Sequence, residues 1–175
     1  MKKTIIMAAA ASLIAGVAVA GTKDVKFPST YAKDFVLYHN IDKPSKKRGP
    51  TFRKFYINKA ALASVKSGKA LPSGTVIVRE DWHVKQDGAN NPAKGANGRF
   101  VPTKKKGVVV MEKRTGWGAS YPASKRNGEW EYAAFKKDGK RNAKAKIGRC
   151  FGCHMKAKGK DFVFSQKALK AAAMK

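Results

Sequence analysis

Thr75 to Val84 (TVIVREDWHV) decides the fold, because this stretch is dense in β-branched residues. Such side chains pack well on the half-buried surface of a pleated sheet, so we expect a strand here. Three more strands are expected at TFRKFYI (51–57), GVVVMEKR (107–114) and EWEYAAF (129–135). Turn and loop segments separate these strands. We therefore predict an α+β fold that is mostly antiparallel β-sheet with a few short helices.

The helices are predicted from capping residues and composition. Asn58 is a candidate N-cap for a short helix through Val65, and Gly68 stands where a C-terminal capping glycine belongs. From Asn142 onward the residues become rich in Ala and Lys, which favours helix. Ser165 is the candidate cap of a last short helix. The C-terminal region is thus predicted to be helical.

Residues 1–20 have the pattern of an export signal. They combine a basic start, an apolar stretch and the cleavage motif Ala18-Val19-Ala20. The apolar stretch falls short of the roughly 20 residues that a membrane span requires, although an uncleaved anchor is the alternative. We predict cleavage after Ala20, no membrane span, and a single exported, periplasmic domain over residues 21–175.

The net charge is strongly positive, since 38 Lys and Arg oppose 11 Asp and Glu to give +27. Such basicity would indicate nucleic acid for a cytoplasmic protein, but an exported protein rarely meets it. We expect no nucleic-acid ligand. An acidic redox partner protein or an anionic membrane surface is the alternative counterpart, beside a solvated basic surface with no specific partner.

Cys150-Phe151-Gly152-Cys153-His154 is a C-x-x-C-H motif, the attachment signature of c-type haem. On one helical turn the two cysteines can bond to the two vinyl groups, and His154 then faces the iron as its proximal ligand. Attachment occurs outside the cytoplasm, in agreement with the export signal. The sequence therefore predicts one covalently attached haem c on a C-terminal helix.

Other uses of the cysteines are a C-x-x-C redox pair or a zinc site. A redox pair normally opens a helix early in a fold, whereas only 21 residues follow His154. Zinc needs a fourth ligand, and the other histidines, His39 and His83, are distant in sequence. Those histidines and Met111 are also the upstream candidates for a sixth iron ligand. None is well placed, so a five-coordinate iron with an open distal face is expected.

The β-rich pattern ending in C-x-x-C-H resembles the cytochrome P-460 family, and within it the cytochromes c′-beta. The resemblance runs from about residue 31 to 154 and rests on FRKFYIN (52–58), SGTVIVRED (73–81) and CFGCH (150–154). Hydroxylamine-oxidising members carry a haem-cross-linking lysine after TVIV, where this chain has Arg79, a poor nucleophile. They also use a distal carboxylate before C-x-x-C-H, and residues 139–149 contain none. Both departures favour the c′-beta subgroup.

The resemblance implies a five-coordinate haem under an apolar, Phe-lined distal pocket. Phe52 is the first candidate for this pocket and Phe55 the second, with ordinary core packing as the alternative for each. Strand alternation places them on opposite faces, so at most one points inward. Arg79 is expected to bind a haem propionate or face the pocket; the alternative is a surface pair with Asp81.

The predicted function is binding of nitric oxide, and of carbon monoxide, for sequestration, transport or detoxification of nitric oxide. Whether the protein is an enzyme stays open, because hydroxylamine or nitric oxide oxidation of P-460 type is the second interpretation. A simple electron-transfer cytochrome is the third. The family resemblance also implies a homodimer.

Overall fold

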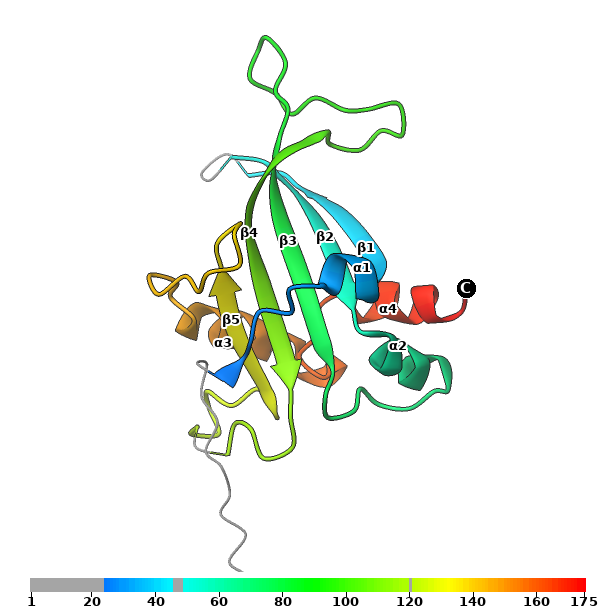
Figure 1. Ribbon diagram of the computed structural model, residues 1–175, viewed down its shortest axis with the longest axis vertical. Helices are drawn as coiled ribbons and strands as arrows, with labels where there is room; N and C mark the ends of the chain where they lie inside the picture. Colours follow the sequence, from blue (N-terminus) through cyan, green and yellow to red (C-terminus); the bar gives the residue numbers. More distant parts are fainter. Residues whose placement is uncertain (1–23, 46–48, 120) are drawn as a thin grey trace, which may run out of the picture.

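The computed structural model describes residues 24–45, 49–119 and 121–175, so the predicted signal peptide lies outside the described residues. Its centre is a five-stranded antiparallel sheet with the strand order β1-β2-β3-β4-β5 (Figure 1). The elements are α1 (Tyr31–Asp34), β1 (Val36–Lys43), β2 (Thr51–Ile57), α2 (Lys59–Lys66), β3 (Val76–Val84), β4 (Pro102–Lys113), β5 (Trp130–Phe135), α3 (Gly148–His154), the 3₁₀ helix η2 (Met155–Lys160) and α4 (Gln166–Ala173). The predicted α+β class is confirmed. Among the described residues, every helix is too short or too polar to cross a bilayer.

The central strand, β3, divides its side chains between two cores. Ile77 and Arg79 point to the face that carries the C-terminal helices, whereas Val78 is buried on the opposite face. In the ladder Arg79 lies opposite Phe55 of β2 and Val109 of β4. Arg79 therefore stands in the middle of the sheet, with an apolar neighbour on each side.

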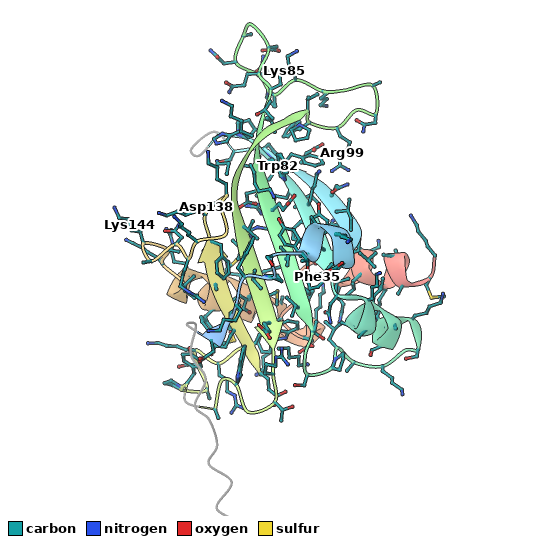
Figure 2. The ribbon with its side chains drawn as sticks, viewed as in Figure 1. Phe35, Trp82, Lys85, Arg99, Asp138 and Lys144 are labelled. Atoms are coloured by element: carbon teal, nitrogen blue, oxygen red, sulfur yellow. The ribbon has the colours of Figure 1, made fainter. Side chains whose placement is uncertain are left out.

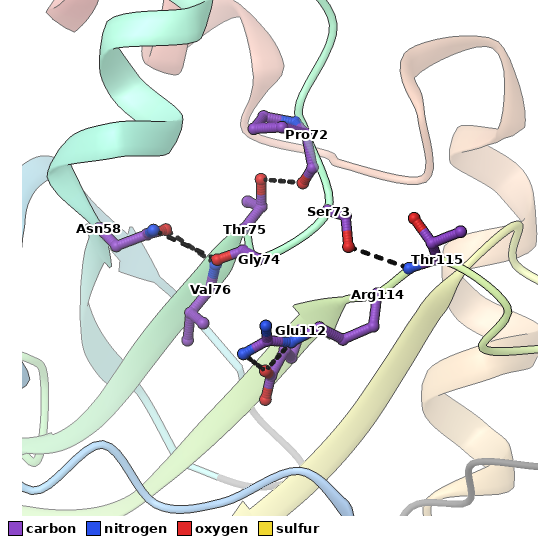
Figure 3. Close-up of polar contacts among 9 residues, drawn as sticks. All are labelled: Asn58, Pro72, Ser73, Gly74, Thr75, Val76, Glu112, Arg114 and Thr115. Atoms are coloured by element: carbon purple, nitrogen blue, oxygen red, sulfur yellow. Dashed lines mark hydrogen bonds and ion pairs between the residues drawn. The ribbon is translucent and has the colours of Figure 1, made fainter. Parts of the chain in front are cut away.

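Polar contacts tie the start of β3 to the chain around it (Figure 3). The Asn58 side chain donates to the Gly74 carbonyl at 3.2 Å and accepts from the Val76 N–H at 2.8 Å. The Thr115 N–H donates to Ser73 Oγ at 3.0 Å. Asn58 does precede α2 as predicted, but its side chain makes no capping hydrogen bond to that helix. It instead fixes where β3 begins.

The first core fills the space between one face of the sheet and the C-terminal helices, which lie behind the sheet in Figure 1. Trp130 is fully buried there. Its main members are Ile57, Ile77, Met111, Trp130, Tyr132, Phe151, Phe162 and Leu169. This packing holds the helix that carries the C-x-x-C-H motif against the sheet.

The second core lies on the opposite face, beneath the N-terminal segment, and encloses a carboxylate. Glu80 is 2% exposed and accepts from Trp82 Nε1 at 2.8 Å, Lys105 Nζ at 2.7 Å and the Tyr31 hydroxyl. Burial alone would raise the pKa of Glu80, but these donors and the lysine charge bring that pKa below its ordinary value. Glu80 is therefore held as a paired anion.

Glu131 is a second buried acid, with 0% exposure, and it is less well satisfied. The Tyr121 hydroxyl donates to its Oε2 at 3.3 Å, while its Oε1 has no hydrogen-bond partner. Burial, helped by the negative charge of Asp24, raises the pKa of Glu131 to about 7. The folded protein thus keeps a proton on Glu131 at a pH where the unfolded chain has released it.

This raised pKa predicts that the protein loses stability as the pH rises from about 5 to about 7. In that window the folded state binds more protons at Glu131 than the unfolded state does. The free energy of unfolding then falls by up to about 1.4 kcal/mol per pH unit. Urea denaturation of wild type and Glu131→Gln across this window measures the effect, with Glu129→Gln as the matched control. A difference between wild type and Glu131→Gln that does not vary with pH contradicts the prediction.

Three segments differ from the sequence-based expectation. Residues 36–43 form the edge strand β1, which was not predicted. Strand β4 begins at Pro102, five residues earlier than expected. Residues 142–147 form turns and irregular chain, so the C-terminal helix α3 starts only at Gly148.

Candidate haem site

A cavity of about 210 Å³ lies between the sheet and the C-terminal helices. It opens to solvent, and its walls come from two sides of the first core. The sheet contributes Ile41, Arg53, Phe55, Ile77, Arg79, Val109, Met111 and Tyr132, and the C-terminal segment contributes Cys153, His154, Val163, Phe164 and Ser165. The C-x-x-C-H helix therefore faces a mostly apolar strand surface across this space.

His154, the last residue of α3, presents its imidazole to the cavity. Its Nδ1 lies 2.7 Å from the carbonyl oxygen of Phe162. A carbonyl only accepts, so Nδ1 carries the proton and Nε2 keeps a free lone pair. Burial lowers the pKa of His154, which favours the neutral ring. The rings of Tyr132 and Phe164, at centroid distances of 4.9 and 5.2 Å, hold its orientation.

A reversal of the chain after η2 brings the Phe162 carbonyl back to His154. Asp161 and Phe162 both adopt left-handed backbone conformations, with φ of 49° and 58°. The Asp161 carboxylate accepts from Lys113 Nζ at 2.9 Å and from the Trp130 indole at 3.3 Å. The sheet thus holds the turn that orients the histidine.

Cys150 and Cys153 lie on the same short helix and are not joined to each other. Cys150 is partly buried against the first core, and burial raises the pKa of its thiol. Cys153 is exposed and lines the cavity. Within the described part of the chain, no group of three or more His, Cys, Asp or Glu side chains is placed to hold a metal ion.

Two arginines and one aspartate form a charged cluster at the cavity wall. Arg79 Nη2 donates to Asp81 Oδ2 at 2.9 Å, and Arg53 Nε lies 3.0 Å from Asp81 Oδ1. Arg79 thus pairs with Asp81 and also lines the cavity, and its contact with a haem propionate stays a prediction. Arg53 was not predicted as a site residue. Its spacing from Phe55 and its register opposite Asp81 place it on the same face of the sheet as those two residues. The cluster carries a net single positive charge.

Of the two candidate phenylalanines, Phe55 lines the cavity and Phe52 does not. Phe52 is buried on the other face of β2, opposite Trp82, with the Arg99 guanidinium 6.0 Å from its ring centroid. The structure thus places Phe55, the second candidate, nearer the cavity than Phe52, the first. Alternation separates them without telling which face carries the cavity.

The three candidate distal ligands differ in whether they line the cavity. Met111 is on the cavity wall, whereas neither His39 nor His83 is among the residues that line it. His39 packs beside Phe55, with 5.7 Å between ring centroids, and His83 is exposed. Of the three, only the methionine lines the cavity.

Comparison with known proteins identifies the class to which this fold and this cavity belong. The family model described as cytochrome P460 matches residues 28–165, which is most of the chain. The protein is accordingly a haem protein, and it belongs to the cytochrome P460 family. A comparison with curated proteins finds no match.

The residues around the cavity fit a haem. A neutral imidazole with one free nitrogen suits the iron, and an apolar strand face suits the flat macrocycle. The Nε atom of Arg79 is buried without a hydrogen-bond partner. Guanidinium groups of this kind suit the propionates, because buried donors need partners and arginine binds carboxylates well.

Proposed function

We propose that the protein is a periplasmic cytochrome of the c′-beta type, with one covalent haem c that binds nitric oxide and carbon monoxide. The proposal rests on one observation above all. The free Nε2 of His154 faces a strand wall that is mostly aliphatic and aromatic, and the two arginines on that wall are paired with Asp81. Such a wall suits a diatomic ligand that needs no polar support. The proposed role is sequestration, transport or detoxification of nitric oxide.

Each residue then has a defined task. Cys150 and Cys153 hold the macrocycle covalently at two points, and His154 supplies the proximal nitrogen. The Phe162 carbonyl keeps that nitrogen unprotonated and correctly aimed. When bound, the haem supplies an iron whose remaining face can take a small ligand. Phe55 limits the size of what enters from the sheet side.

An oxidising enzyme of P-460 type receives less support from these residues. Arg79 occupies the position of the cross-linking lysine implied by the family resemblance, and a guanidinium is a poor nucleophile. No carboxylate is among the residues that line the cavity, and Asp81 beside it is paired with both arginines. The described residues of the cavity lining therefore offer no free carboxylate for a proton relay of that type.

The gas-binding proposal predicts different effects for Phe55→Ala and Phe52→Ala. Removing the Phe55 ring opens the cavity wall, so the rate of carbon monoxide binding to the ferrous protein should rise several-fold. Removing the buried Phe52 ring should leave that rate unchanged but cost about 3–5 kcal/mol of stability. Flash photolysis measures the first effect and urea denaturation the second. Equal binding rates in wild type and Phe55→Ala would show that Phe55 plays no part in ligand access.

Met111 on the cavity wall supports a second candidate function, electron transfer with a thioether as the sixth ligand. This alternative predicts a low-spin spectrum in wild type that becomes high-spin in Met111→Leu, a change that preserves side-chain volume. The gas-binding proposal predicts that both proteins are high-spin. The same pair of visible spectra therefore separates the two functions.

A further inference from the structure

A second apolar groove, of about 520 Å³, runs along α3 and shares no lining residue with the cavity. Tyr121, Ile147 and Phe151 supply its apolar surface, and Lys125 lies at its edge. Gly148 and Gly152 also line it, and a Cβ atom added at either would meet nothing within 4 Å. The groove is thus open at positions where packing does not require glycine.

An unbroken series of aromatic rings leads from this groove to the proximal histidine. The Tyr121 and Phe151 ring centroids are 5.0 Å apart, those of Phe151 and Tyr132 are 4.8 Å apart, and those of Tyr132 and His154 are 4.9 Å apart. Asn127 is 1% exposed, and its side-chain amide donates to the Tyr132 hydroxyl at 2.9 Å and to the Phe151 carbonyl at 3.2 Å. The surface groove and the iron ligand are therefore held in one rigid, closely packed unit.

The C-terminal segment that forms one side of the groove is basic. From Gly139 to Lys160 the chain has no Asp or Glu, and each of its Lys and Arg residues is exposed. These are Lys140, Arg141, Lys144, Lys146, Arg149, Lys156, Lys158 and Lys160. A charged surface of one sign attracts and orients a partner of the opposite sign. The groove offers such a partner an apolar contact beside exposed basic residues, since Lys125 lines it and Lys146 and Arg149 flank its residues Ile147 and Gly148 in the chain.

We propose that this groove is the docking site of an acidic one-electron carrier protein, which reduces the haem through the α3 side of the molecule. The inference rests on the proposed haem attachment at Cys150 and Cys153. One electron leaves the reduced carrier and converts ferric iron to ferrous, and no bond is formed or broken. The carrier places an apolar side chain in the groove while its carboxylates face the surrounding lysines.

Reduced plant-type ferredoxin, a small acidic one-electron carrier, serves as the probe. Stopped-flow absorbance gives the second-order rate of haem reduction, and calorimetric titration of the two oxidised proteins gives their affinity. The Lys125→Glu/Lys146→Glu variant should lower the rate about tenfold and weaken the affinity in parallel. In wild type the rate should fall as salt is added, because salt screens surface charges.

The matched control is Lys85→Glu/Lys94→Glu, which changes the net charge equally on the extension between β3 and β4. Figure 2 shows Lys85 on this extension, well away from Lys144 near the C-terminal helices. In this control variant the rate of haem reduction should stay within about twofold of the wild-type rate. Equal losses in the two double variants would mean that only total charge matters, and would overturn the docking site. Gly148→Glu, which reaches into the groove from an uncrowded position, should also slow reduction.

Two further outcomes would overturn the inference. One is unchanged ferredoxin kinetics in Lys125→Glu/Lys146→Glu while binding to anionic phosphatidylglycerol vesicles is lost, which would assign the surface to a membrane. The other is a rate of haem reduction equal to that of wild type in both Gly148→Glu and Lys125→Glu/Lys146→Glu. Covalent haem is quantified in every sample first. Absence of covalent haem from wild type would contradict the proposed function itself. Covalent haem in every sample, with the same reduction rate in wild type and in the variants, would contradict only the docking site.

Discussion

Replacing Cys150 and Cys153 together by serine is expected to remove all covalently bound haem. Both residues lie on the turn of α3 that ends at His154, and a hydroxyl does not form the thioether that holds a c-type haem. After denaturing electrophoresis, a haem stain should mark wild type and leave the double variant blank. Single variants should keep one thioether, with an altered alkaline pyridine spectrum because one vinyl group is free.

The matched control for this loss is Ala143→Ser, which adds a serine at an exposed position near the motif. Its haem stain should equal that of wild type. A stained band from the Cys150→Ser/Cys153→Ser variant would contradict covalent attachment at these residues. Zinc bound by purified wild type in place of haem would contradict it as well.

The second large effect is expected at Trp130, whose replacement by alanine should cost about 3–5 kcal/mol. Trp130 is 0% exposed in the first core, and its indole donates to Asp161 at 3.3 Å. The loss leaves a cavity under the C-terminal helices and frees the turn that aims His154. Against a typical total stability of about 5–15 kcal/mol, this change brings the protein close to unfolding.

Urea denaturation measures this loss, and Trp117→Ala is the control. Trp117 is only partly buried and packs at the edge of the second core, so its removal should cost clearly less. Similar midpoints for Trp130→Ala and wild type would contradict the assigned packing of the helices on the sheet.

The sequence predicted the strands whose own residues are rich in β-branched and aromatic side chains. Strand β2 spans residues 51–57 as expected, and β3 begins one residue later than predicted. Strand β1 was missed because its residues, VLYHNIDK, do not alternate between apolar and polar. Pairing with β2 makes it a strand. The polar start of β4, PTKKK, is likewise extended only because it pairs with β3.

Composition alone misled the prediction between residues 142 and 147, where Ala and Lys favour helix. The Asn142 N–H instead donates to the Ala134 carbonyl at 2.9 Å, which ties this segment to the end of β5. Phe135 also bridges Arg141, so the chain turns back and pairs with the end of β5, which helix propensity does not take into account. This contact outweighs the helix propensity of residues 142–147.

For the site, the C-x-x-C-H motif predicted which residues share a helix turn, and alternation predicted that only one of Phe52 and Phe55 could face the cavity. Which of them does so depends on where the C-terminal helices pack. The Phe162 carbonyl could not be predicted as the partner of His154 either, because it depends on two consecutive left-handed residues. That conformation is uncommon outside glycine and has no clear sequence pattern here.

The most direct test of the proposed open-iron haem site is the visible absorption spectrum of the purified ferrous protein, recorded before and after carbon monoxide is added. We predict a broad, high-spin Soret band that sharpens with carbon monoxide. A sharp, low-spin spectrum that ignores carbon monoxide would show a strong sixth ligand, with Met111 as the first candidate, and would contradict gas binding. A strongly red-shifted ferrous band would show a cross-linked haem and favour the hydroxylamine-oxidising function instead.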